Sequence, residues 1–219
     1  MGGNETDLNG LTRVAGLWAA GEAACVSLHG ANRLGSNSTA ECLVWGGITG
    51  AEIAKALEKQ PSVPALPDRQ VEAARRRVDD LLARDGGESL YELRKELRAT
   101  MDAKMGVFRT GEGMKEALEK VREIKKRSLK AGVADKSRTY NTNLFHALEL
   151  ENLVDLAEVA VAGALAREES RGAHARRDFP TRDDAKWLKH TLCFREKDGV
   201  RLDYKPVTID TWKPVERKY

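Results

Sequence analysis

The residues whose types and spacing suggest chemistry gather between Gly21 and Thr39. Glu22 offers a carboxylate, and Arg33 offers a planar guanidinium whose paired N–H groups match the two oxygens of a carboxylate ligand. Ser38 and Thr39 stand where a helix is expected to begin, and the backbone N–H groups of a first helical turn attract electron-rich atoms. This segment therefore predicts a binding site for a ligand with acidic or electron-rich oxygens.

A purely structural interpretation of the same segment remains open. In it the segment is an ordinary strand–loop–helix turn, in which Arg33 forms an ion pair and Ser38 caps the helix.

The elements that must position these side chains follow from the apolar pattern. Residues 14–22 predict a short buried strand that ends at a glycine and places Glu22 at a sheet edge, where ligands commonly bind. A glycine-punctuated loop comes next. An apolar helix is expected over 38–59, with Asn37 or Ser38 as its N-cap.

The remainder of the chain predicts helices and then a hairpin. Residues 60–67 hold three prolines and indicate a linker, and residues 68–140 indicate a helical bundle. Residues 141–219 predict a long helix, capped by Asn141 or Asn143, followed by a C-terminal β-hairpin. Apolar residues recur every three or four positions in the three expected bundle helices: Val71, Ala74, Val78 and Leu81; Leu90, Leu93, Leu97, Met101 and Met105; Met114, Leu118, Val121 and Ile124. The predicted fold class is α+β and mostly helical.

Smaller features complete the expectations for these regions. Ser89 matches the start of a capping box, and Lys197-Asp198-Gly199 is a good hairpin turn between strands expected over 187–195 and 200–209. Structural hydrogen bonding is the expected role of His146, His174 and His190. The arginines and aspartates between Arg171 and Asp184 are expected to form ion pairs or to meet another subunit.

Composition excludes several classes of function. The 219 residues carry a net charge of +3 from 37 basic and 34 acidic side chains, a balance that argues against nucleic acid as a partner. The cysteines Cys25, Cys42 and Cys193 lack the spacing of a zinc site or a disulfide framework, so a reducing compartment is expected. No apolar run reaches the roughly 20 residues of a membrane helix, so any membrane attachment is expected through a partner.

Three sequence blocks resemble one family of flavoproteins. The first combines M-G-G at the start with G-L-W-A-A-G-E-A-A-C-V-S-L-H-G-A-N-R-L-G-S-N-S, the second is N-T-N-L-F-H-A-L-E-L-E-N-L, and the third is E-E-S-R-G-A-H-A-R-R-D-F-P-T-R-D-D followed by W-L-K-H-T-L. In this order they resemble the carboxy-terminal portion of the flavoprotein subunit of succinate dehydrogenase and fumarate reductase. The resemblance implies that residues 1–59 are the C-terminal segment of an FAD-binding domain.

The resemblance also implies roles for individual residues. Glu22 would contact FAD, Ser38 and Thr39 would bind the flavin ring through backbone N–H groups, and Arg33 would bind a carboxylate of succinate or fumarate. Thr39 replaces a small apolar residue such as leucine, which a backbone contact tolerates. No catalytic residue and no metal ligand is expected in this chain. His29 is not equivalent to the family's substrate-binding histidine, which precedes M-G-G.

The function implied is the interconversion of succinate and fumarate by hydride transfer with FAD, within a larger enzyme. The adenine-nucleotide-binding fold, the histidine that carries FAD and the capping domain have no counterpart in the sequence, so the chain alone is expected to be inactive. The implied partners are the missing amino-terminal flavoprotein half, an iron–sulfur subunit and, indirectly, a membrane anchor. The implied place is the cytoplasmic face of the cell membrane. The alternative is a catalytically incomplete module that docks on the iron–sulfur or anchor subunit.

Overall fold

A computed structural model describes residues 1–59, 65–197 and 199–215, which form two compact units. The first unit contains residues 1–70 together with 171–173, and the second contains 71–170 and 174–219. Of the predicted linker, residues 60–64 lie outside the described part, and residues 65–67 adopt neither helix nor strand.

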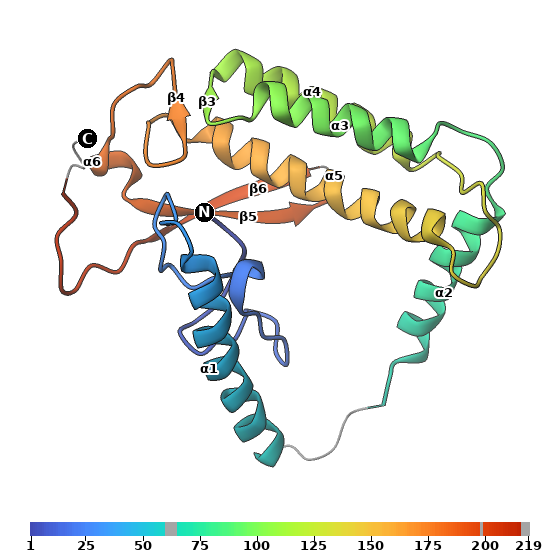
Figure 1. Cartoon of the computed structure of the whole chain (residues 1–219), viewed down its shortest axis with the longest axis horizontal. Coiled ribbons are helices and arrows are strands. Elements are labelled where there is room, and N and C mark those ends of the chain that lie inside the picture. The colour runs from blue at the N-terminus through green and yellow to red at the C-terminus, as the bar shows by residue number, and fades with distance from the viewer. Residues whose placement is uncertain (60–64, 198, 216–219) are drawn as a thin grey trace. The chain divides into compact units, whose positions relative to one another are not determined.

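The first unit is built around one long helix (Figure 1). Helix α1 spans Asn37–Lys59 and so begins one residue before the predicted start. Asn37 and Ser38 are its first two residues, so neither stands before the helix as the predicted N-cap. Strand β1 (Asn4–Glu5) pairs in parallel with β2 (Ala24–Cys25), and the short 3-10 helix η1 (Gly21–Ala23) packs on α1.

The buried strand predicted over residues 14–22 is wrong. The segment turns repeatedly: Leu17 N–H donates to the carbonyl of Val14, and Gly16 and Gly21 have φ angles of 79° and 67°. These left-handed conformations interrupt an extended strand. Val14 is 61% exposed and Leu17 is 51% exposed, so the apolar pattern here does not mark burial within the described residues.

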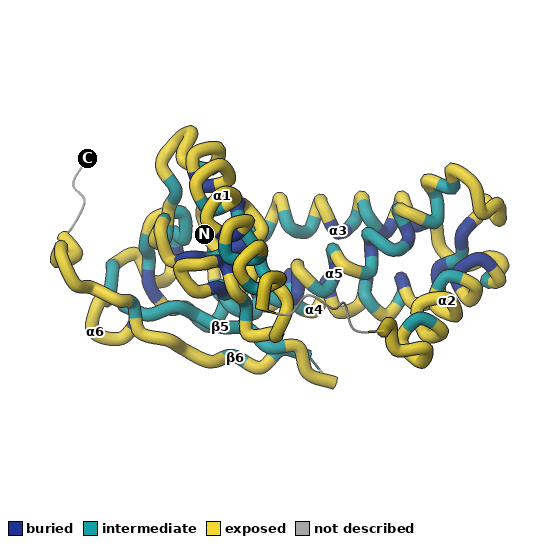
Figure 2. The backbone as a smooth tube through the Cα atoms, turned by 90° about the horizontal axis from the view of Figure 1, so that it is seen from below, coloured by how far each residue is buried: buried dark blue, intermediate teal, exposed yellow. Residues whose placement is uncertain are grey.

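The second unit is a bundle of antiparallel helices in which the long helix takes part (Figure 1). Helix α5 (Thr142–Ala166) packs along α3 (Leu90–Lys104) and α4 (Gly111–Ser128). Helix α2 (Asp68–Ala83) contributes mainly Leu81 near its end. The core includes the predicted positions Leu90, Leu93, Leu97, Met114, Val121 and Ile124, joined by Ala147, Leu150, Val154 and Val161 of α5. Figure 2 shows buried and exposed positions interspersed along these helices.

Helix caps in this unit follow the sequence in part. Asn141 accepts a hydrogen bond from Leu144 N–H at 2.7 Å and so caps α5, and Thr110 caps α4 in the same way through Gly113 N–H. Ser89 occupies the N-cap position of α3, but its side chain makes no capping hydrogen bond, so the capping-box prediction is wrong.

Strands complete the second unit. Strand β5 (Lys189–Glu196) pairs antiparallel with β6 (Gly199–Pro206), which confirms the hairpin, and Asp198 of its turn lies outside the described residues. The short helix α6 (Asp184–Trp187) precedes β5, and Asp183 caps it by accepting a hydrogen bond from Lys186 N–H. Because this helix includes Trp187, the strand starts later than the predicted residue 187. Strands β3 (Phe108–Arg109) and β4 (Ala175–Arg176) form a short parallel pair.

These elements confirm the mostly helical α+β class. The thiols of Cys25, Cys42 and Cys193 are free. Within the described ranges, no helix has both the length and the apolar character needed to cross a bilayer.

Candidate functional site

The loop before α1 has a backbone that only tertiary contacts can maintain. Ser27 and Ser36 have φ angles of 68° and 65°, and Gly30 between them has 58°. A residue other than glycine in this left-handed region costs on the order of 1–3 kcal/mol, and such residues cluster at ligand sites. Arg33 lies between these special positions, so its place depends on what holds the loop.

Glu22 and Arg33 form an ion pair. Nη1 of Arg33 donates to Oε1 of Glu22 at 2.7 Å, and the side chains are 28% and 66% exposed respectively. The hydrogen bond and the charge of Arg33 lower the pKa of the Glu22 carboxyl, and a hydrogen bond with Ser38 lowers it further. The structure therefore brings three of the four predicted site residues, Glu22, Arg33 and Ser38, to one place.

The first turn of α1 presents the expected positive end of a helix dipole. It holds no acidic residue, and α1 is 23 residues long. The N–H of Thr39 donates to the carbonyl of Ser36 at 3.2 Å. A ligand acceptor at Thr39 would therefore share this N–H in a three-centre hydrogen bond or replace the bond to Ser36.

A buried pair beside this site was not anticipated from the sequence. Nε2 of His29 lies 2.5 Å from Oε2 of Glu41, and the side chains are only 12% and 4% exposed. Glu41 is the single acidic residue between Asn37 and Gly50, in an otherwise apolar stretch of α1. That isolated carboxylate was the available signal, because a buried acid requires a partner.

A close backbone approach also holds the loop. Ala173 N–H donates to the carbonyl of Ala31 at 3.1 Å. Gly172 has a φ of 57°, and a Cβ there would lie 2.7 Å from the carbonyl carbon and oxygen of Ala31. Glycine is therefore required at 172 for this contact.

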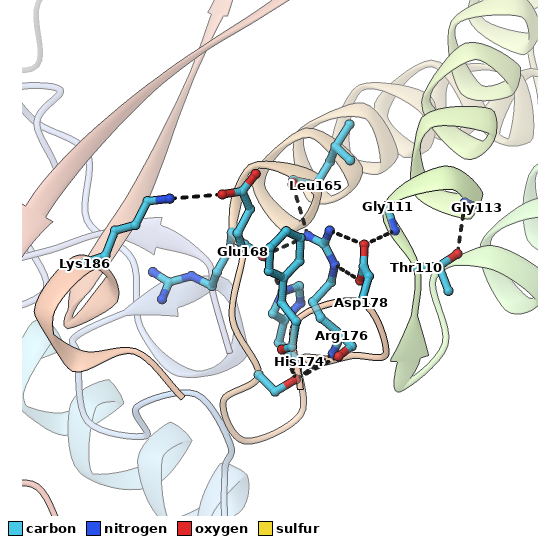
Figure 3. A network of polar contacts seen from close by, with 12 residues as sticks. Thr110, Gly111, Gly113, Leu165, Glu168, His174, Arg176, Asp178 and Lys186 are labelled. Carbon is cyan, nitrogen blue, oxygen red and sulfur yellow. Dashed lines mark hydrogen bonds and ion pairs between the residues drawn. The ribbon is translucent and has the colours of Figure 1, made fainter. Parts of the chain in front are cut away.

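The second unit contains its own polar network, drawn in Figure 3. Arg176 is 2% exposed and donates to both carboxylate oxygens of Asp178 at 2.8 Å, as well as to the carbonyls of Leu165 and Arg167. Asp178 in turn accepts from Gly111 N–H at the start of α4. This network and the Arg182–Asp184 pair confirm the predicted ion pairing in the tail.

His174 is held by hydrogen bonds on both ring nitrogens. Nη1 of Arg109 lies 2.9 Å from Nδ1, and Nε2 lies 3.1 Å from the carbonyl of Arg167. This fixes the tautomer, since Nδ1 accepts and Nε2–H donates. Burial and, to a smaller degree, the neighbouring arginines lower the pKa of His174. The imidazole is therefore a neutral structural group, and His146 is likewise engaged by Arg94 and Glu149.

Within residues 1–59, 65–197 and 199–215, no group of His, Cys, Asp or Glu side chains is arranged to hold a metal ion.

Two family models match the chain. One, described as fumarate reductase flavoprotein C-term, matches residues 94–219, and the other, an FAD binding domain, matches residues 1–39. The second match covers Glu22, Arg33, Ser38 and Thr39.

Individual relatives agree with the family matches. The chain is 46% identical, over its full length, to a fumarate reductase flavoprotein subunit of Mycobacterium tuberculosis, and 42% identical over 94% of its length to a succinate dehydrogenase flavoprotein subunit of Rickettsia conorii. It covers 39% and 36% of these relatives, so it spans about two fifths of their length. A solved structure of an Escherichia coli quinol fumarate reductase superposes with a TM-score of 0.92 at 39% identity, covering 98% of this chain and 37% of that one.

Proposed function

This chain belongs to the fumarate reductase flavoprotein family, and we propose that it forms part of an FAD-dependent enzyme that interconverts succinate and fumarate. The observation that carries the proposal is the convergence of Glu22, Arg33 and Ser38 within the stretch that matches the FAD-binding family. An acid-binding guanidinium and the positive end of a helix stand side by side there.

The residues present fit the flavin end of FAD. The α1 N-terminus favours an electron-rich ring edge through its dipole and the N–H groups of Ser38 and Thr39. Glu22 is ionised and exposed, so it accepts hydrogen bonds from hydroxyl groups of the cofactor. Gly30 and Gly35 leave open space where a Cβ would stand. Bound FAD supplies the hydride acceptor or donor.

Arg33 orients the dicarboxylate. Among the described residues, its hydrogen bond runs from Nη1 to Glu22, which leaves the other guanidinium N–H groups for a substrate carboxylate. The hydrogen bond to Glu22 contributes to the orientation of the guanidinium while the substrate binds. A substrate gripped in this way loses rotational freedom before the reaction, and the guanidinium withdraws electron density through the bound carboxylate.

The proposed partners complete the enzyme. The remaining part of the flavoprotein would supply the adenine-nucleotide-binding fold and the capping domain. An iron–sulfur subunit would take or deliver the electrons, and a membrane anchor would hold the complex at the cytoplasmic face of the cell membrane without touching this chain. Membership of a family that includes a quinol fumarate reductase supports this arrangement.

The test is an activity assay on the assembled flavoprotein that includes this chain. We expect a bound-flavin absorbance spectrum and succinate-dependent reduction of an artificial electron acceptor. A correctly folded assembly that binds FAD but neither oxidises succinate nor reduces fumarate would refute the proposal. An assembly that docks on the iron–sulfur subunit without any flavin absorbance would favour the docking module instead.

A further inference from the structure

We propose that the His29–Glu41 pair holds residues 27–36, the Arg33 loop, against the first turns of α1 and so positions the site. The pair thereby fixes the direction of the guanidinium relative to the helix N-terminus. Neither residue need touch a ligand, so both are positioning residues. The inference rests on the proposed function, since it concerns the geometry of that same site.

The burial of the pair makes it a strong constraint. The Glu41 side chain is 4% exposed and faces Nε2 of His29 at 2.5 Å. Removing one partner from a buried pair leaves a charge or a donor without compensation, which costs far more than breaking an exposed pair. The loop can therefore leave α1 only at a large cost.

The position of the pair in the chain allows it to constrain the site residues. His29 precedes Arg33 by four residues, and Glu41 follows Ser38 by three. The contact between His29 and Glu41 therefore joins the two ends of the segment that contains Arg33 and Ser38, and so closes a ring. Glycines and the left-handed Ser36 lie within this ring. Residues 29–36 of this segment lie in neither helix nor strand, so contacts with other segments hold their geometry.

Two other contacts hold the loop, and neither is a buried side-chain pair. Arg33 is tied to Glu22 by an ion pair that is largely exposed, and Ala31 is tied to Ala173 through the backbone. An ion pair with an exposed carboxylate contributes little to stability, so it defines the loop weakly. The buried His29–Glu41 contact is the anchor that joins the loop to the helix whose N-terminus belongs to the site.

The experiment compares Glu41→Ala, His29→Ala, the double variant and Glu41→Gln in the assembled flavoprotein. Glu52→Gln is the control, because Glu52 lies on the same helix in a more exposed pair with Lys55. We expect Glu41→Ala to raise the KM for fumarate roughly tenfold with a smaller change in kcat, since binding geometry is what changes. The double variant should add little to either single variant, because the two residues act as one contact. Glu41→Gln, which keeps the hydrogen bond, should recover most of the loss.

A second readout does not depend on activity. Amide hydrogen exchange over residues 27–36 should rise in Glu41→Ala and stay unchanged in Glu52→Gln. If both KM and exchange stay at wild-type values in Glu41→Ala, or if melting temperature and FAD content fall with KM unchanged, the pair is only structural and the inference is wrong. If Glu41→Ala fails to fold, a wild-type KM and wild-type exchange in His29→Ala overturn it. A wild-type protein without dicarboxylate turnover refutes the proposed function instead, while the exchange measurement still decides whether Glu41 holds the loop.

Discussion

The guanidinium of Arg33 and the carboxylate of Glu22 face each other at 2.7 Å across the start of α1, although eleven positions separate them in the chain. The two groups were expected to serve different ligands, Arg33 a dicarboxylate and Glu22 FAD. Their pairing couples those two roles, because a change in either side chain alters the direction and charge of the other. The pKa of Glu22 lies below its ordinary value, so its carboxyl group is ionised at neutral pH.

Replacing Arg33 by lysine should weaken turnover even though the positive charge remains. An ammonium group cannot donate two parallel N–H bonds to a carboxylate while also holding Glu22. We expect kcat/KM for succinate to fall roughly a hundredfold, because one or two charge-assisted hydrogen bonds to the substrate are lost. Arg76→Lys is the matched control, since Arg76 forms an exposed pair with Glu72 on α2. An unchanged kcat/KM in Arg33→Lys would remove this residue from the site.

Substituting Gly172 by alanine should displace the Arg33 loop. The new Cβ would meet the Ala31 backbone at 2.7 Å, and a φ of 57° is itself strained for alanine. Gly16→Ala is the control, because Gly16 has a φ of 79° but open space around its Cβ position. We expect Gly16→Ala to lose about 1–2 kcal/mol of unfolding free energy from backbone strain, and Gly172→Ala to lose about 1–3 kcal/mol more from the clash. Urea denaturation measures both losses, and equal losses would contradict the close approach.

Asp178→Asn should destabilise the second unit. The substitution leaves the buried Arg176 guanidinium with one side-chain acceptor oxygen at position 178 where it now has two, and it removes the compensating charge. We expect a loss of about 2 kcal/mol at neutral pH, in the range of hydrogen bonds to charged groups. Asp79→Asn is the control, because the Asp79–Arg138 pair is exposed and should change stability by no more than about 1 kcal/mol.

The Asp178 effect should also depend on pH in a defined direction. Hydrogen bonds from Arg176 and Gly111 hold the pKa of Asp178 far below its ordinary value. A depressed pKa stabilises the fold above the unfolded value of about 3.9, and that stabilisation is lost as the pH falls below it. The difference between wild type and Asp178→Asn should therefore be constant from pH 7 to about pH 5 and shrink in stronger acid. A difference that grows in acid would contradict the pairing.

His174 should titrate below the ordinary value of 6.5, because burial and nearby arginines disfavour its charged form. A depressed histidine pKa means that the unfolded chain binds the proton more tightly, so stability is full above pH 6.5 and declines as the pH falls below it. The titration of the ring C–H signals by NMR measures this directly, with an unstructured peptide of the same local sequence as reference. A midpoint at or above that of the peptide would contradict the neutral, doubly hydrogen-bonded ring.

The amino-acid sequence by itself determined the long helices and pointed to the candidate site. Periodic apolar residues such as Leu93 and Val121 define helical faces locally, and Asn141 caps α5 through a contact three residues away. Sequence blocks also identified the family. These features are local in the chain, so neighbouring residues are enough to predict them.

Only the tertiary structure decided how the site residues meet. The predicted strand before Glu22 became a series of turns, and the Glu41 carboxylate proved to be buried against His29. Left-handed residues occur in both places, Gly16 and Gly21 in the turns and Ser27 and Ser36 in the loop before α1, and apolar periodicity does not encode them. Contacts across such a loop are set by the path of the backbone in space, because the energy that stabilises an unusual φ comes from partners distant in sequence.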